Sequence, residues 1–118
     1  MQYMLLIIEP PLQRRNRTEA EGQAVYDRMV KFAGELQERG VLRGVESLQS
    51  HAQATRVQVR GGQTQVLDGP FAEAKEMIGG YFLVDVPNRE AALAIAAACP
   101  AAEWCTVEVR AFGPCYDA

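Results

Sequence analysis

The sequence has too few histidines and cysteines to build a metal centre or a disulfide framework. It contains one histidine, His51, and three cysteines, none of them in a Cys-x-x-Cys spacing. A structural zinc site needs four closely spaced ligands, and a disulfide-stapled domain needs an even number of cysteines. Glycine-rich motifs for phosphate or dinucleotide binding are also missing. We therefore expect no metal and no cofactor, and we expect free thiols.

Long apolar runs and an excess of positive charge are missing as well. No segment approaches the ~20 apolar residues of a membrane span, and the apolar start, residues 1–8, lacks the basic residues of a signal peptide. The formal net charge is −3, and the dense basic cluster of Arg14, Arg15 and Arg17 has no interleaved aromatic residues. The sequence predicts a cytoplasmic protein that binds neither membranes nor nucleic acid, with this cluster in a solvated loop.

What the chain does have is the composition of an ordinary globular domain. Its 118 residues are 48% hydrophobic and 23% charged, which is typical of folded proteins. A chain of this length buries roughly two-thirds of the surface that its unfolded form exposes, which is enough for a core without disulfide bonds or a structural metal. We predict a single domain over residues 1–118.

Hydrophobic periodicity predicts six strands and two helices. The strands are expected at residues 2–8, 41–49, 54–60, 64–67, 78–86 and 103–110. Thr18 and Glu21 form a capping-box pattern at the start of an amphipathic helix that ends at Gly40. Asn88 is the expected N-cap of an alanine-rich helix that ends before Pro100.

The central part of the chain predicts a hairpin. Gly61-Gly62 is a two-residue turn between strands 54–60 and 64–67. Strand 54–60 alternates between β-branched and polar residues, so we expect one buried and one wet face. Residues 71–76, between the hairpin and the next strand, are expected to form a turn or a short helix. Residues 112–118 are expected to form a tail.

The order of the elements predicts an α+β fold. Without the central hairpin the order is βαββαβ, the split βαβ arrangement of ferredoxin-like domains. In such a fold both helices cover one face of a mostly antiparallel sheet. The other face stays open, and an open apolar face invites a partner, so we expect a homodimer.

Several stretches resemble the YCII-related proteins of the DGPF type. The segments MQYMLLII (1–8), DGPFAEAKE (68–76), GGY (79–81) and VEVR (107–110) are similar to family stretches. Together they span nearly the whole chain. The DGPFAEAKE block is specific because it is long and joins residues that share no structural propensity.

The resemblance implies a ferredoxin-like domain that dimerises, sheet against sheet, into an α/β barrel, with the family's active site in clefts between sheet and helices. It also implies a bacterial protein, since such proteins often accompany extracytoplasmic-function sigma factors. Some distant relatives are lyase-like enzymes for small aromatic or lactone compounds, with a His-Asp dyad whose histidine comes early in the chain. The first predicted helix here, residues 18–39, contains no histidine, so the dyad is not carried over.

Asp68, Lys75 and His51 are the candidate catalytic residues. Asp68 directly follows a predicted strand and would be a general base there; the alternative is ordinary Asp-Gly-Pro turn chemistry. Lys75 would neutralise an anionic substrate, or else belong to a surface ion network. His51 would assist as acid or base, or else lie on a loop surface.

The candidate ligand-binding residues surround the same block. They are Arg56, Arg60, Phe71, Glu73, Glu76 and Tyr81. Arg56 and Arg60 share one face of strand 54–60, so together they would clamp a carboxylate; the alternative is a wet strand face. Phe71 and Trp104 are also expected as anchors of the core or of the dimer interface.

These observations leave three functions open. The first is a dimeric domain of undefined cellular role that binds an unidentified small molecule, with sigma-factor regulation as one setting for it. The second is a cofactor-independent lyase or isomerase for a small anionic or aromatic compound, with Asp68 as base. The third is a protein-interaction module in sigma-factor signalling. The first ranks ahead because the sequence shows no complete catalytic constellation.

Overall fold

The computed structural model describes residues 1–117 and contains the predicted six strands and two helices. Their order is β1 (Gln2–Glu9), α1 (Glu19–Glu38), β2 (Leu42–Ser47), β3 (Thr55–Arg60), β4 (Gln63–Asp68), β5 (Met77–Asp85), α2 (Arg89–Ala98) and β6 (Thr106–Ala111). Ala118, the end of the predicted tail, lies outside the described residues. No helix within residues 1–117 is both long and apolar enough to cross a membrane.

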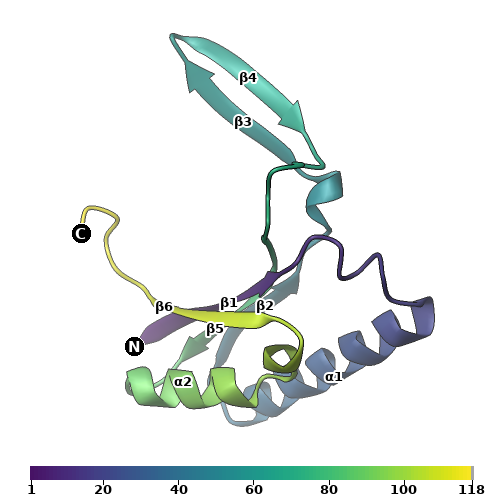
Figure 1. Cartoon of the computed structure of the whole chain (residues 1–118). Coiled ribbons are helices and arrows are strands. Elements are labelled where there is room, and N and C mark those ends of the chain that lie inside the picture. The colour runs from purple at the N-terminus through teal and green to yellow at the C-terminus, as the bar shows by residue number, and fades with distance from the viewer. Residues whose placement is uncertain (118) are drawn as a thin grey trace.

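Four strands form the main sheet, in the order β2-β5-β1-β6, and every neighbouring pair is antiparallel. Both helices lie against the same face of this sheet (Figure 1). The α+β class is therefore confirmed, and the arrangement is compatible with a ferredoxin-like fold.

The core lies between the sheet and the helices. Inward-facing residues of the two central strands supply one side of it, and apolar residues of α1 and α2 supply the other. Its largest buried side chains include Tyr3, Leu5, Ile7, Phe82, Val84, Phe32, Leu36 and Ile95. Phe32 and Phe82 meet edge to face, with ring centres 5.6 Å apart, so α1 is fixed to β5 through an aromatic pair.

The predicted helix ends are confirmed. The side chain of Thr18 accepts from the backbone N–H of Glu21, and the Glu21 carboxylate accepts from the N–H of Thr18. Gly40, just beyond α1, has a φ of 75°, which favours glycine. Asn88 caps α2 through the N–H of Ala91.

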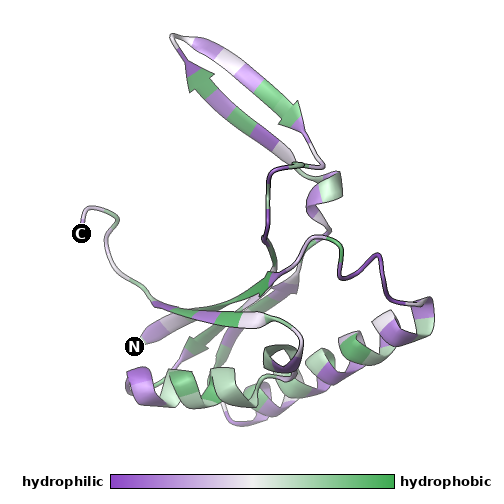
Figure 2. Ribbon diagram, viewed as in Figure 1, coloured by the Kyte–Doolittle hydropathy of each residue, from purple (hydrophilic) through white to green (hydrophobic). Residues whose placement is uncertain are grey.

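The β3–β4 hairpin stands apart from the main sheet. Figure 1 shows it rising from the face opposite the helices. Its turn residues, Gly61 and Gly62, have φ angles of 58° and 78°, as a two-residue hairpin turn requires. Every residue of β3 and β4 is exposed. The prediction of one buried face is therefore wrong, although the alternation behind it is real (Figure 2).

The face of the main sheet away from the helices carries an apolar stripe. Register places Leu6 opposite Tyr81 and Met4 opposite Leu83, next to the inward pair Leu5 and Phe82. Because side chains alternate along a strand, these four residues point away from the helices. All of them are only half-buried in the single chain. We call this surface the open face.

The predicted start of the last strand differs from the structure. The last strand begins at Thr106 rather than at residue 103, because Pro100–Glu103 forms a 3₁₀ turn after α2. Residues 71–76 form turns and no helix, which is one of the two predicted forms.

Candidate functional site

The DGPF motif joins the base of the hairpin to the loop after β2. Asp68 is exposed, and its carboxylate accepts a hydrogen bond of 2.8 Å from the Thr55 hydroxyl on the facing strand. The N–H of Gly69 donates to the Ala54 carbonyl at 2.8 Å. A Cβ at Gly69 would clash with the carbonyl of His51. The glycine is therefore needed for the close approach of these two backbone segments.

Three predicted site residues contact one another: Arg56 and His51 both lie against the ring of Phe71, which is 4% exposed. The Arg56 guanidinium carbon lies 3.7 Å from the centre of the ring. The His51 imidazole meets the ring edge on, with ring centres 5.8 Å apart. Nδ1 of His51 is buried and has no hydrogen-bond partner among residues 1–117. The structure thus brings these three residues together from three separate segments.

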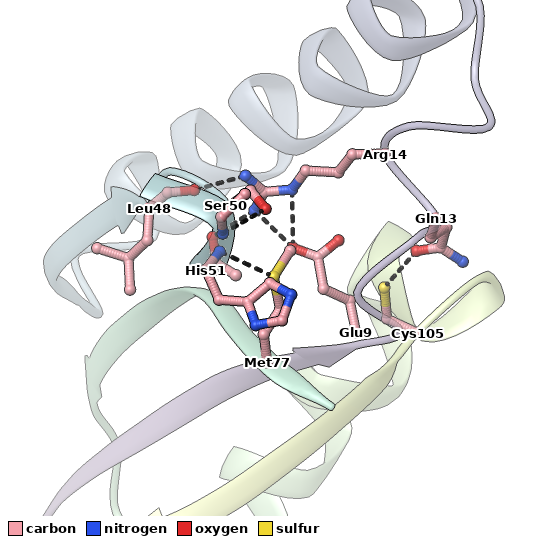
Figure 3. Close-up of polar contacts among 10 residues, drawn as sticks. Glu9, Gln13, Arg14, Leu48, Ser50, His51, Met77 and Cys105 are labelled. Carbon is pink, nitrogen blue, oxygen red and sulfur yellow. Dashed lines mark hydrogen bonds and ion pairs between the residues drawn. The ribbon is translucent and has the colours of Figure 1, made fainter. Parts of the chain in front are cut away.

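His51, Arg56 and Phe71 line a cavity of about 630 Å³, which we call the His51 pocket. Glu76 also lines it, so four of the nine predicted site residues meet here. Its apolar walls are Ile8, Leu48, Met77 and Ile78. The backbone N–H of His51 points to the sulfur of Met77 at 3.4 Å, which places the imidazole beside β5 (Figure 3).

The other predicted site residues lie elsewhere. Asp68, Glu73 and Lys75 are exposed and line neither of the two cavities described here. Arg60 lies beside the hairpin turn, where its guanidinium donates to the carbonyl of Val59. Tyr81 is among the residues that line the second cavity, although its side chain lies on the open face. Of the two arginines on that strand face, only Arg56 reaches the His51 pocket.

The second cavity lies between α1 and the sheet, and we call it the helix cleft. Its volume is about 510 Å³, within the range of small-molecule sites. The C-terminal half of α1 buries Phe32 and Leu36, but Val25 and Met29, nearer its N-terminus, are only half-buried. Because the helix packs closely at one end only, its other end leaves room above the sheet.

The mouth of the helix cleft carries aromatic and cationic side chains. Trp104, Tyr26 and Arg17 line it. The guanidinium carbons of Arg17 and Arg28 lie 5.8 and 5.3 Å from the centre of the Trp104 ring. Cation–π contacts of this kind hold the ring in place. Trp104, which we expect as an anchor of the core or of the dimer interface, is a half-buried wall of this cleft.

Glu9, at the polar end of the helix cleft, is the buried charged residue among those the structure describes, with 5% exposed. Arg14 donates to its Oε1 twice, from Nε at 2.9 Å and from Nη2 at 2.5 Å. Arg14 also donates to the carbonyls of Leu48 at 2.7 Å and Gly79 at 3.1 Å (Figure 3). A single guanidinium therefore fixes the ends of β1 and β2 and the start of β5.

The Gly79-Gly80 pair makes room for this ion pair. A Cβ at Gly79 would clash with the Glu9 carboxylate and lie 2.9 Å from Nη2 of Arg14. A Cβ at Gly80 would lie 2.7 Å from the Glu46 carbonyl. The register between β1 and β5 shifts at this point. Gly79-Gly80 therefore forms a bulge where the backbone of β5 comes close to its neighbours.

Sequence reasoning missed Glu9 and Arg14. The prediction of a solvated loop is wrong for Arg14, whose side chain is 32% exposed and paired. A signal was present, because Tyr3, Leu5 and Ile7 alternate along β1 and Glu9 is the next residue on the same inward side. A carboxylate on the buried register of a strand needs a partner, and Arg14 follows five positions later.

The cysteines are free thiols with unequal surroundings. Cys99 is buried, and burial raises the pKa of its thiol. Desolvation, followed by the nearby charge of Glu9, raises the pKa of Cys105 to about 11. The Cys105 thiol lines the helix cleft and donates to Gln13 Oε1 at 3.2 Å. It therefore acts as a neutral donor near pH 7 and not as a thiolate nucleophile. Cys115 is exposed.

Metal-ligating side chains do not gather at either cavity. Within residues 1–117 no group of three His, Cys, Asp or Glu side chains is placed to hold a metal ion. The helix cleft combines one buried carboxylate, a paired arginine and apolar walls, whereas the His51 pocket combines an unpaired arginine with an imidazole. Arg17 and Glu46 also line the helix cleft, and Glu76 lines the His51 pocket. The two cavities therefore differ in the kind of buried polar group, a carboxylate in the cleft and an imidazole nitrogen in the pocket.

Comparison with known proteins gives one family and one relative. The family model of the YCII-related domain matches residues 1–113. An uncharacterized protein of Rhizobium meliloti (strain 1021) is 39% identical over 56 residues. That match spans 48% of this chain and 45% of the relative's length, so the relative includes much that the match does not cover.

Proposed function

Because the chain belongs to the YCII-related domain family, we propose that it is a domain that binds a small organic molecule in the helix cleft. One observation carries the proposal, namely the buried Glu9 carboxylate at the end of a cleft with largely apolar walls. Ligand sites combine an apolar lining with a few fixed polar groups in this way. The family's expected site, between sheet and helix, lies in the same region.

The geometry of Glu9 indicates which ligand the cleft would accept. Both hydrogen bonds from Arg14 go to Oε1, and among residues 1–117 no donor bonds to Oε2. A ligand hydroxyl or ammonium group could donate a hydrogen bond to Oε2, which would satisfy the second oxygen of the carboxylate. Val25, Met29 and Phe82 offer the apolar surface for the rest of the molecule. We therefore propose a ligand with an aromatic or apolar body and a hydrogen-bond-donating head.

Binding is better supported than the chemistry of a lyase. Asp68, the proposed base, is exposed and already accepts from Thr55, and it lines neither cavity. A general base must lie within hydrogen-bond reach of the proton that it removes, in a site that holds the substrate. The link to sigma-factor signalling that the resemblance implies stays a prediction, and co-purification with a sigma factor from its own cell would test it.

A cleft-filling variant tests the binding proposal. Gly22 lines the cleft, and a Cβ there meets no atom within 4 Å, so Gly22→Leu adds bulk at a position where the first carbon of the side chain has room. In calorimetric titrations with benzylamine and benzyl alcohol, we expect this variant to lose about tenfold in affinity or more. Gly34→Leu is the matched control, because Gly34 is also helical and unobstructed but exposed on α1 away from the cleft. Equal affinity in both variants, or no binding by the unmodified protein, would refute the proposal.

We further propose that the protein is a homodimer, built on the open face and on the hairpin. The hairpin presents Val57, Val59 and Val66 on one side, 63%, 58% and 64% exposed. An isolated two-stranded hairpin is marginally stable in water, and it rises on the same side as the open face (Figure 1). A second copy covering both surfaces would bury these apolar side chains together, as a sheet-against-sheet barrel requires.

The dimer proposal predicts which substitutions make monomers. Lysine at Leu6, on the open face, or at Val57, on the apolar side of the hairpin, would place a charge in the interface and should yield a monomer by light scattering. Gln58→Lys adds the same charge on the opposite side of β3 and should leave the dimer intact. A monomeric unmodified protein would contradict the proposal, and a dimeric Val57→Lys variant would remove the hairpin from the interface.

A further inference from the structure

The His51 pocket contains a buried polar atom that no residue of the described chain satisfies. Nδ1 of His51 has no partner among residues 1–117, although it is buried. A buried nitrogen without a partner destabilises a fold, and such groups in native proteins usually have a reason. His51 lines a cavity of about 630 Å³, which is roomy enough for a small organic molecule.

Arg56 supplies the second polar group of the pocket. Its guanidinium stacks on Phe71 at 3.7 Å, and within residues 1–117 it makes no ion pair or hydrogen bond. Stacking uses the face of the guanidinium and leaves the N–H groups at its edge free. A planar guanidinium held in one orientation is suited to bidentate binding of a carboxylate.

His51 and Arg56 together limit the chemical class of ligand that the pocket can bind. Both side chains contact Phe71 and both residues line the pocket, so a carboxylate held by Arg56 would share the cavity with the imidazole. With its proton on Nδ1, His51 donates to such a carboxylate. Glu76 lines the same pocket and adds a negative charge, which disfavours ligands with several negative charges.

We propose that the His51 pocket is a second binding site, specific for a small monocarboxylic acid with an apolar or aromatic body. Arg56 and Nδ1 of His51 bind the carboxylate, and the body packs against Leu48, Met77 and Ile78. The site is independent of the helix cleft, since the two cavities share no lining residue. Its ligand is an anion, whereas the ligand of the helix cleft donates to an anion.

The DGPF motif gains a role in this proposal. Gly69 allows the backbone to approach the His51 carbonyl, and Phe71 provides the surface on which Arg56 stacks. The motif therefore holds together the base of the hairpin, which carries Arg56, and the loop that carries His51. Asp68 serves this arrangement through Thr55 and does not itself contact the proposed ligand.

Calorimetric titration with phenylacetate and with phenylacetamide, its neutral analogue, tests the proposal. We expect saturable binding of phenylacetate, weakened about tenfold or more in Arg56→Gln because a bidentate charged contact is lost. Arg60→Gln is the matched control, since Arg60 lies on the same face of β3 at the hairpin tip, and it should bind phenylacetate as the unmodified protein does. His51→Ala should also weaken the binding of phenylacetate, and phenylacetamide should bind poorly to every variant.

Three results would overturn the proposal: no saturable phenylacetate binding, equal losses in Arg56→Gln and Arg60→Gln, or equal affinities for phenylacetate and phenylacetamide. Both arginines are exposed, so the folded state should survive, and circular dichroism checks this. Gly22→Leu separates the two sites. It should leave phenylacetate binding unchanged while it weakens the binding of benzylamine. The proposal for the His51 pocket and the proposal for the helix cleft can therefore fail independently.

Discussion

Replacing Gly79 with alanine is expected to destabilise the protein by about 3 kcal/mol, at the upper end of what overpacking usually costs. The added Cβ would overlap the carboxylate of Glu9 and lie 2.9 Å from Nη2 of Arg14. These atoms belong to a buried ion pair that also holds the Leu48 carbonyl, so they cannot move without breaking other bonds. The free energy of unfolding, measured in urea at one fixed protein concentration, gives the effect.

A second glycine in the same chain provides the control for this prediction. Gly34 lies inside α1, where a Cβ meets no atom within 4 Å. Gly34→Ala should stabilise the protein by roughly 0.5 to 1 kcal/mol, because alanine loses less backbone entropy in a helix. If Gly79→Ala were as harmless as Gly34→Ala, the close approach of β5 to the Glu9–Arg14 pair would be wrong.

The sequence alone predicts the secondary structure well because the local signals are strong. The capping box of Thr18 and Glu21 and the positive-φ turn of Gly61 and Gly62 depend on residues within a few positions, so tertiary packing does not alter them. The strand order follows from the element order, because split βαβ units admit few topologies. The family follows from the DGPF block.

The hairpin shows where this kind of reasoning fails. Alternation along residues 55–60 indicates two chemically different faces, and both exist, but it does not indicate what covers the apolar one. Val57 and Val59 are exposed in the single chain, because the hairpin leaves the main sheet. Burial depends on contacts between segments that are distant in sequence, or between chains, and a local pattern carries no information about them.

The site was only partly predictable for the same reason. His51, Arg56, Phe71 and Glu76 were each singled out by residue type, yet their meeting in one cavity depends on the path of the DGPF loop. Glu9 and Arg14 were missed because Arg14 was grouped with its neighbours Arg15 and Arg17 by charge. The side chain of Arg14 turns inward to a buried carboxylate, and charge patterning alone does not reveal that.

Arg14→Met is expected to cost about 3 kcal/mol of stability, because removing one partner of a buried pair leaves the other charge without compensation. Glu9 is 5% exposed and the Arg14 side chain 32%, so the penalty should fall at the low end for buried pairs. Methionine retains most of the apolar stem of arginine, which limits the loss of packing. Urea unfolding against the unmodified protein measures the change.

The decisive form of this experiment adds Glu9→Met, which removes the buried charge as well. If the cost of Arg14→Met arises from the stranded carboxylate, the double variant should be more stable than the sum of the two single changes predicts, by about 2 kcal/mol. It should not return to the unmodified value, since the carbonyls of Leu48 and Gly79 still lose their donor. Simple additivity would show that the two side chains do not depend on each other. In that case Arg14 would stabilise the protein mainly by joining the ends of three strands, and Glu9 would be free to serve the ligand alone.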